Sequence, residues 1–378
     1  MKSYSLLLLV GLLSLRAWSQ QTITASLTHD GKDRSYILYV PESYEADRPA
    51  PLVLNFHGYT SNANDQMWYG DFRAIADTAG FLVVHPQGSL LNGITHWNVG
   101  GWTVGSTTDD VGFTEALLDE LSSNYNIDQK RIYSTGMSNG GFMSFLLACQ
   151  LSNRIAAVAS VTGSMTPETY VACDPQHPTP VMQIHGVVDG VVPYFGANWT
   201  RSIADVLAYW RDYNNCSAEL IKTDVPNTNL LDASSASYQV YLDGDNGSTV
   251  EHFRISGGGH TWPGSFPSPG TNQDFDASLE IWKFFSRYNL DDLGGVTSVH
   301  EQPAQATKLQ LFPNPTQGLL TIQSKQAMGS PYQIHSIHGQ LMKEGIFVNE
   351  RQELDLAKLA KGVYILRVGN KGFKIIKD

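Results

Sequence analysis

Most of the chain alternates between short apolar runs and longer segments in which apolar residues recur at helical spacing. The short runs have the pattern of strands buried on both faces of a sheet, and they cover 51–57, 81–85, 131–137, 156–161 and 181–185. The longer segments have the pattern of amphipathic helices, and they cover 109–124, 140–151, 198–213 and 276–288. Strands that alternate with helices predict an α/β fold with a mostly parallel sheet and helices on both faces.

Two further strand patterns adjoin this alternation. Residues 35–40 alternate between polar and apolar positions, so we expect an edge strand there. Residues 238–242 and 249–255 are strand-like and flank the turn sequence Asp-Gly-Asp-Asn-Gly at 243–247. This turn has part of the pattern of a calcium loop but lacks the later ligands, so a hairpin turn is the favoured interpretation.

The pattern changes after residue 290. Residues 291–306 are polar and include Pro303 without any apolar period, which predicts a linker. Residues 307–378 contain short strand-like runs between turn residues, which predicts a small all-β sandwich; the runs lie at 309–312, 319–323, 332–336, 345–348 and 363–368. The large α/β unit is therefore expected to span 20–290.

The first residues predict export. Lys2 precedes an apolar run at 6–15, and the small residues Ala17 and Ser19 follow it. This arrangement is typical of a secretory signal peptide over 1–19, with a buried N-terminal helix as the alternative. A ten-residue run is too short to span a bilayer, which needs about 20 residues, and no other stretch predicts a transmembrane segment. We therefore expect an extracellular or cell-surface protein.

Composition excludes some functions. The net charge of −11 argues against a broad nucleic-acid footprint, although residues 307–378 carry a net charge of +5 and residues 1–306 one of −16. Cys149, Cys173 and Cys216 lack the spacing of a zinc site, and no nucleotide or dinucleotide fingerprint is present, so no metal or cofactor is expected. Export permits one disulfide, for which Cys149–Cys173 is the favoured pair.

A nucleophile motif lies at the end of the strand predicted at 131–137. Residues 136–140 read Gly-Met-Ser-Asn-Gly, and a helix follows, which is the setting of a G-x-S-x-G elbow. A strained turn lifts the serine hydroxyl above the sheet, and glycines two residues away leave it room. Ser138 is therefore the expected nucleophile, against the alternative of a structural serine in a turn.

A serine nucleophile needs a base that an acid orients, and in this type of fold the acid precedes the histidine in the chain. Asp189 follows the strand at 181–185 and is the expected acid, with a loop-capping aspartate as the alternative. His260 lies in the glycine-rich segment 257–264 and is the expected general base.

Two backbone N–H groups are expected to form an oxyanion hole. One belongs to Asn139, directly after the nucleophile, and the other to Tyr59 in the loop after the first buried strand, with Thr60 as the alternative. We expect His57 to hold that loop by a hydrogen bond rather than to act as the base, because it precedes the serine in the chain.

The stretch from Pro51 to Tyr288 resembles the secreted polyhydroxybutyrate depolymerases and their relatives, the feruloyl and acetyl-xylan esterases. The matching pieces are 56–59, 97–98, 109–113, 136–141, 185–186 with Asp189, 193–194 and 257–264. The resemblance implies an α/β-hydrolase and a serine esterase with Ser138, Asp189 and His260 as its triad. Relatives often carry a cysteine near position 244 that could partner one like Cys216; here that position is Gly244, so Cys216 is expected to be free.

The small unit is similar to the C-terminal sorting domain of Bacteroidetes type IX secretion. The similarity rests on Leu-Phe-Pro-Asn-Pro at 311–315 and on Gly-Val-Tyr-Ile-Leu-Arg at 362–367 before a basic end. It implies that the type IX machinery is a partner and that the protein is released or attached at the cell surface. A carbohydrate-binding β-sandwich is the alternative.

Aromatic residues in the motif loops suggest how a substrate is held. Trp97, Tyr194 and Trp262 are the expected substrate-binding residues, with packing as the alternative for each. Because type IX cargo often degrades polysaccharides, we expect an enzyme that removes feruloyl or acetyl groups from plant polysaccharide. The alternatives are a depolymerase of polyhydroxybutyrate, a non-catalytic glycan-binding surface protein and, less favoured, a protease.

Overall fold

The structure is a computed structural model that describes residues 20–293, 309–324, 330–336, 340–368 and 371–378. We call residues 20–293 the large region and the described residues from 309 onward the C-terminal region. The expected signal peptide at 1–19 lies outside the described residues, and so does the expected linker except for 291–293. Within the described residues, no helix combines the length and apolarity needed to cross a bilayer.

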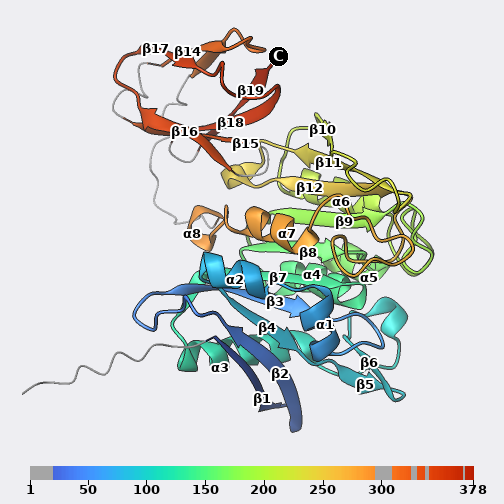
Figure 1. Cartoon of the computed structure of the whole chain (residues 1–378). Coiled ribbons are helices and arrows are strands. Elements are labelled where there is room, and N and C mark those ends of the chain that lie inside the picture. Colours follow the sequence, from blue (N-terminus) through green and yellow to red (C-terminus); the bar gives the residue numbers. More distant parts are fainter. Residues whose placement is uncertain (1–19, 294–308, 325–329, 337–339, 369–370) are drawn as a thin grey trace, which may run out of the picture.

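One ten-stranded sheet forms the centre of the large region (Figure 1). Its strand order is β1-β2-β4-β3-β7-β8-β9-β12-β11-β10. The six strands from β4 to β12 in this order are mutually parallel, whereas β1, β2, β11 and β10 pair antiparallel. The strands are Gln21–His29 (β1), Lys32–Val40 (β2), Ala50–Phe56 (β3), Leu82–Pro86 (β4), Ile127–Met137 (β7), Ala157–Val161 (β8), Val181–Gly186 (β9), Ile221–Asp224 (β10), Ser235–Tyr241 (β11) and Val250–Ser256 (β12).

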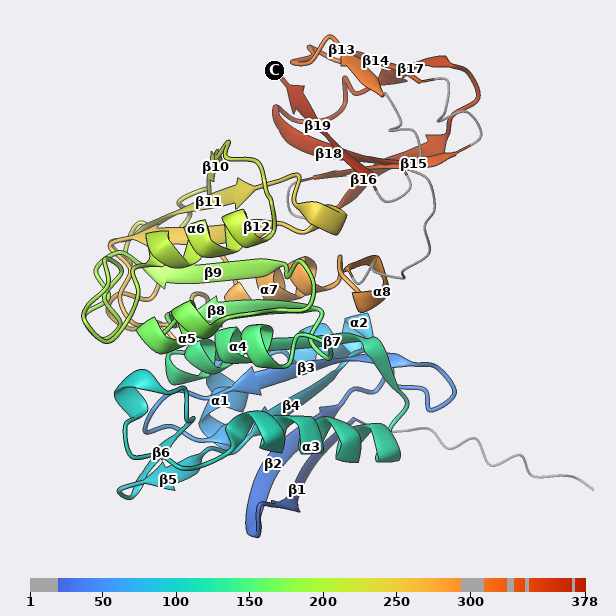
Figure 2. The same cartoon turned by 180° about the vertical axis from the view of Figure 1, so that it is seen from behind.

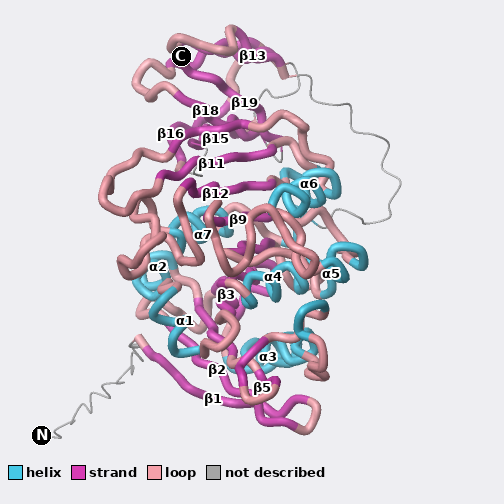
Figure 3. The backbone as a smooth tube through the Cα atoms, turned by 90° about the vertical axis from the view of Figure 1, so that its right-hand side faces the viewer, coloured by secondary structure: helices cyan, strands magenta, loops and turns pink. Residues whose placement is uncertain are grey.

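Helices cover both faces of this sheet, as Figure 3 shows with α1, α2 and α7 on one side and α3 to α6 on the other. Two separate buried clusters lie beneath them, one under α3, α4 and α6 and one under α2 and α7. The helices are Ala63–Tyr69 (α1), Arg73–Ala79 (α2), Asp110–Asn124 (α3), Asn139–Gln150 (α4), Pro167–Ala172 (α5), Ile203–Tyr213 (α6), Ala277–Phe285 (α7) and Leu290–Leu293 (α8), and a small hairpin joins Ser89–Leu91 (β5) to Ile94–His96 (β6). This is the mostly parallel sheet with helices on both faces that the alternating pattern predicted, and the α/β-hydrolase architecture that the resemblance implied.

The expectation that residues 35–40 form an edge strand is wrong. It lies inside β2, which is not at the edge because β1 pairs with it along nine residues. In β1 half-buried and exposed residues alternate, since its inner side chains pack against the cluster under α3 while its outer ones face solvent. The edge of the sheet is therefore β1 on one side and β10 on the other.

The C-terminal region consists of two antiparallel sheets (Figure 2). Their inward residues form a third buried cluster that includes Leu320, Ile334 and Leu366. The first sheet contains Gln310–Phe312 (β13), Leu319–Gln323 (β14) and Arg351–Asp355 (β17), and the second contains Pro331–Ser336 (β15), Leu341–Ile346 (β16), Gly362–Val368 (β18) and Lys371–Lys377 (β19). The all-β prediction is therefore confirmed, although β17 and β19 were not anticipated.

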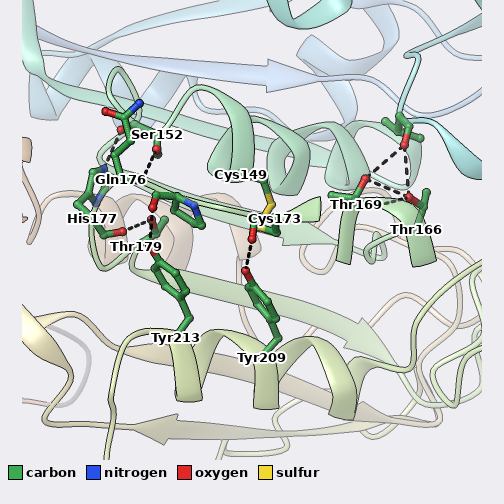
Figure 4. The surroundings of a disulfide bond; sticks show 12 residues. Cys149, Ser152, Thr166, Thr169, Cys173, Gln176, His177, Thr179, Tyr209 and Tyr213 are labelled. Atoms are coloured by element: carbon green, nitrogen blue, oxygen red, sulfur yellow. Dashed lines mark hydrogen bonds between the residues drawn. A yellow bond between two sulfur atoms is a disulfide. The ribbon is translucent and has the colours of Figure 1, made fainter. Parts of the chain in front are cut away.

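The favoured disulfide, Cys149–Cys173, is present, and Cys216 is free. The disulfide joins the end of α4 to the residue after α5, and the Tyr209 hydroxyl on α6 donates a hydrogen bond to the Cys173 carbonyl (Figure 4). The bond thus fixes α4, the helix that begins directly after Ser138, to its neighbours on that face of the sheet.

Candidate active site

Ser138 occupies the turn between β7 and α4. Its backbone angles are φ 55° and ψ −118°, a region that residues with a side chain rarely adopt. A Cβ at Gly136 or Gly140 would collide with the Phe56 carbonyl oxygen on the neighbouring strand β3. The two glycines therefore allow the turn to lie against β3 while the serine side chain stays partly exposed.

Asp189 and His260 contact each other directly. The imidazole Nδ1 of His260 lies 2.8 Å from Asp189 Oδ2. The two residues follow β9 and β12, which are adjacent parallel strands, so both loops leave the same edge of the sheet. Gly186 has no room for a Cβ because the Gly258 backbone lies against it, and Val188 donates its N–H to the Gly258 carbonyl at 3.1 Å. This close approach of the two loops brings the histidine to the acid.

The Asp189 carboxylate is fully buried but well supplied with donors. Oδ1 accepts the backbone N–H groups of Val191 and Val192, at 2.8 and 2.9 Å. Oδ2 faces His260 and, at 3.3 Å, Nε2 of His185. Burial alone would raise the pKa of this carboxyl, but the hydrogen bonds from His185 and His260 outweigh it and hold the pKa far below its usual range. The group is therefore ionised at neutral pH and can orient His260.

The structure brings Ser138 to the same edge of the sheet as this pair, because β7 and β9 both pair with β8 in parallel. Among the described residues, however, the Ser138 side chain makes no hydrogen bond to His260. The serine hydroxyl and the His260 Nε2 are each left without a partner in the described part of the chain, so both remain available for a substrate.

The loop after β3 lies against the nucleophile. A Cβ placed on Gly58 would be 3.4 Å from Cβ of Ser138. The Thr60 N–H donates to the Thr95 carbonyl at 3.0 Å, which removes the alternative oxyanion donor from use. The Tyr59 N–H has no acceptor among the described residues, and the Asn139 N–H opens α4, where first-turn N–H groups lack an intrahelical acceptor.

His57 holds this loop in place. Its Nε2 accepts the Gly88 N–H at 2.9 Å, so the ring proton is on Nδ1, which donates to the Gly58 carbonyl at 2.7 Å. Burial lowers the pKa of His57 to about 4, which keeps the ring neutral. Both ring nitrogens are thus engaged in structural bonds, and neither is available as a base for Ser138.

The expectation that Trp97 and Trp262 bind substrate is wrong. Their side chains are 0% and 1% exposed, so neither ring offers a face to a substrate. The indole N–H of Trp97 donates to the His57 carbonyl, and the Asn139 side chain bonds to the Trp97 backbone, so this residue ties the elbow to the oxyanion loop. Trp262 instead packs on Phe72 and donates to the Ser278 hydroxyl, which anchors the His260 loop.

Tyr194 remains partly exposed, with its hydroxyl 3.0 Å from Nε2 of His252 and its ring against Phe195. A second group of rings lies beside the oxyanion loop, and we call it the Trp102 cluster: Tyr59, Trp102, Phe142 and Trp199. The Trp102 ring centroid is 5.7 to 6.1 Å from those of the other three. Phe142 is four residues after Ser138 and hence on the same side of α4.

Sequence reasoning missed three residues of this neighbourhood: His185, Gln183 and Trp199. His185 opens the turn that carries Asp189, and its spacing of four residues from the acid is the signal that could have marked it. Gln183 sits inside an apolar strand and contacts His185. Nothing in the local sequence links Trp199 to Trp102, from which it is separated by almost one hundred residues.

Two family models match the chain. Residues 34–202 match the family described as Esterase PHB depolymerase, and residues 310–378 match the family described as Secretion system C-terminal sorting domain. The first match lies within the large region, which is thus similar to esterases of this family, and the second covers the C-terminal region and indicates an exported protein.

Curated relatives also resemble this chain. A bifunctional acetylxylan esterase/xylanase of Neocallimastix patriciarum is 29% identical over 272 residues, which are 72% of this chain and 36% of the relative. Feruloyl esterase B of Piromyces equi is 29% identical over 238 residues, 60% of this chain and 42% of the relative. The chain thus spans less than half the length of these two relatives. The solved acetyl xylan esterase from Aspergillus awamori is 15% identical, covering 65% of this chain and 94% of its own, with a TM-score of 0.48.

Proposed function

We propose that this protein is a secreted serine carboxylester hydrolase. Ser138 Oγ attacks the ester carbonyl while His260 takes the hydroxyl proton, and the N–H groups of Tyr59 and Asn139 stabilise the oxyanion that forms. His260 then returns the proton to the departing alcohol. Water attacks the acyl-enzyme with the same base, releasing the acid and restoring Ser138.

The observation that carries the proposal is the Asp189–His260 hydrogen bond at the sheet edge to which the strained Ser138 turn also belongs. A buried, ionised carboxylate holds the imidazole Nδ1, which leaves Nε2 to act as the base. The esterase domain match supports the same reaction class.

Two readouts test this activity. A fluorophosphonate probe should label the wild-type protein on Ser138, and Ser138→Ala should abolish labelling and lower kcat for p-nitrophenyl acetate by roughly 10³- to 10⁶-fold. Undiminished hydrolysis by the variant would contradict the proposal. Strong glycan binding by a wild-type protein that takes no label would instead favour the non-catalytic glycan-binding alternative.

For the substrate, we propose feruloyl or acetyl esters on plant polysaccharide. The names of the two curated relatives support this class. The Trp102 cluster favours an aromatic acyl group, because the exposed ring of Tyr59 and the half-buried rings of Trp102 and Trp199 lie beside the oxyanion loop and can pack on a phenolic ring, while the buried Phe142 supports them from below. The Trp102 indole N–H is also buried without a partner among the described residues, so a bound acyl group could accept its hydrogen bond.

The second candidate substrate is polyhydroxybutyrate, which the description of the matching family names. A paired assay separates the two candidates: release of ferulate or acetate from feruloylated and acetylated xylan, against clearing of a polyhydroxybutyrate film. Ferulate or acetate release without film clearing supports the polysaccharide ester, and the reverse result supports the polyester.

We further propose that the chain divides into a signal peptide at 1–19, a hydrolase domain at 20–290, a linker at 291–306 and a sorting domain at 307–378 that the type IX machinery recognises. The buried residues of two of the three clusters all belong to the large region, and only the half-buried Val363 and Ile365 of the C-terminal region pack against one of them, which supports the folding of the large region alone. Residues 20–293 expressed separately should keep the ester-hydrolysing kcat of the full chain. Loss of soluble, active protein would contradict this division.

A further inference from the structure

His185 lies at the end of β9 with its ring fully buried. Its Nδ1 is 3.0 Å from Nε2 of Gln183, two residues earlier on the same strand. Its Nε2 is 2.9 Å from the Val192 carbonyl oxygen and 3.3 Å from Asp189 Oδ2. The Nδ1 edge of the ring therefore contacts the Gln183 amide, while the Nε2 edge contacts Val192 and Asp189 in the turn that carries the acid.

The identity of the Gln183 amide atoms follows from a second contact. The same Nε2 lies 3.0 Å from the Gly163 carbonyl oxygen, which can only accept a hydrogen bond. The atom that faces this carbonyl must therefore be the amide nitrogen, with its two protons directed to Gly163 and to His185. The Gln183 oxygen is buried without a partner among the described residues, which shows that the amide is held by its donors alone.

The donor from Gln183 fixes the tautomer of His185. Because Nδ1 accepts a hydrogen bond, the single proton of the neutral ring must be on Nε2. That proton is directed at the Val192 carbonyl at 2.9 Å, and the same nitrogen lies 3.3 Å from Asp189 Oδ2, close enough to attract the carboxylate. The opposite tautomer would place an Nε2 lone pair against both oxygens and repel the turn.

We propose that His185 is a positioning residue of the ester-hydrolysing site, which Gln183 locks as the Nε2–H tautomer so that it fixes the Asp189–Val192 turn and aims the carboxylate at His260. This inference rests on the proposed function. Asp189 Oδ1 is held by two backbone N–H groups, and His185 contacts Oδ2, the oxygen that also faces His260. Without it, the carboxylate can rotate or shift and His260 loses its orientation.

The test compares two variants of His185. His185→Leu removes the donor and keeps an apolar side chain in the buried site, whereas His185→Gln carries an amide nitrogen that can reach the position of Nε2. We expect kcat for p-nitrophenyl acetate to fall about 10- to 100-fold in His185→Leu, the loss typical when an orienting outer partner is removed, with KM unchanged. His185→Gln should recover most of this loss at a similar melting temperature.

Equal losses in the two variants, or a change confined to KM, would overturn the positioning role. If His185→Leu fails to fold, the comparison of His185→Gln with Gln183→Met decides the question, because Gln183→Met keeps the approximate shape of the glutamine and removes its amide, whose oxygen has no partner among the described residues. Gln183→Met should lower kcat. The double variant His185→Leu with Gln183→Met should lose no more than His185→Leu alone. Additive losses would show that Gln183 does not act through His185.

The failure of this inference differs from failure of the proposed function. If fluorophosphonate labels Ser138 and kcat is the same in His185→Leu as in the wild type, the hydrolase remains and the positioning role is wrong. If Ser138 takes no label in the wild type, the proposed function itself fails.

Discussion

The large region and the C-terminal region bury their apolar residues in different ways. The parallel centre of the large region has helices on both faces and therefore two buried clusters. The C-terminal region has two antiparallel sheets that face each other across one cluster. Because parallel strands all end at one edge, the first arrangement collects Ser138, Asp189 and His260, whereas the second gathers no comparable set. The charges differ as well, at −16 for residues 1–306 and +5 for residues 307–378.

The largest expected effect comes from changing the acid. In Asp189→Asn, the amide cannot accept all the donors that face the carboxylate, and its own N–H would repel one of them. His260 would then be held in the wrong tautomer, and we expect kcat to fall by about 10⁴-fold. Ester hydrolysis measured beside the matched variant Asp109→Asn checks this prediction. Asp109 caps α3, where asparagine caps equally well, and its other contact is with His29 on β1, so that control should retain activity.

The contrast between Asp109 and Asp189 also shows which parts of the site can be predicted from the sequence. Asp109 begins the predicted helix 109–124 and caps α3 in the structure, whereas Asp189 follows a predicted strand. The elbow at Ser138 could be predicted because strand, turn and helix are continuous in sequence. Of the side chains that contact Asp189, His260 was predicted from its glycine-rich segment 71 residues later, whereas the role of His185 at the end of β9 was not predicted.

Burial was the property that sequence patterns predicted least well. Trp97 and Trp262 stand in polar, glycine-rich surroundings in the sequence, yet both are enclosed by segments that come from elsewhere in the chain. β1 was missed for a related reason: its alternation is marked by single apolar residues between threonines and serines, and only pairing with β2 makes it a strand. Local patterns thus predicted the parallel centre well and the outer strands and ring environments less well.

Acid should destabilise the large region more than the C-terminal region. Burial lowers the pKa of His57 to about 4 and those of His85 and His252 to about 3. Below about pH 6.5 the unfolded chain binds protons on these rings and the folded chain does not. Stability is therefore lost as the pH falls from about 6.5 towards 4 and 3, by up to about 1.4 kcal/mol per pH unit for each ring.

Urea unfolding at pH 7, 6 and 5, followed by the fluorescence of the tryptophans, measures this slope in the large region, because it contains seven of the eight tryptophans and residues 307–378 contain none. His85→Leu should make the unfolding free energy depend less steeply on pH, because it removes one of the three rings from a fully buried site outside the candidate active site. A slope that is unchanged in His85→Leu would show that this ring is not held neutral by burial.

The disulfide should stabilise the large region by a smaller amount. Cys149 and Cys173 are 24 residues apart, and closing a loop of this size stabilises a fold by about 3 kcal/mol. Cys149→Ser with Cys173→Ser should lower the melting temperature of the large region and leave that of the C-terminal region unchanged.

Cys216→Ser is the matched control, because Cys216 forms no disulfide and its replacement removes no cross-link. Burial raises the pKa of the Cys216 thiol to about 12, so alkylation by iodoacetamide at pH 8 should be slow in the folded wild type.

The smallest expected effect concerns the contact between the regions. Lys374 on β19 forms an ion pair with Glu219 at 2.8 Å, and nearby Val363 and Ile365 of β18 pack against the cluster under α2 and α7. The Glu219 side chain is largely exposed, so the ion pair should contribute about 0.2–1 kcal/mol. A double-mutant cycle with Lys374→Ala and Glu219→Ala measures that coupling, which 1 M salt should remove because exposed charges are screened.

Val363→Ala tests the apolar part of the contact. It should lower the free energy of unfolding more than either charge variant does, and 1 M salt should not change this loss. The opposite result, a larger loss of unfolding free energy in the charge variants than in Val363→Ala, would contradict this expectation. It would show that the opposite net charges of the two regions stabilise the contact more than apolar packing does.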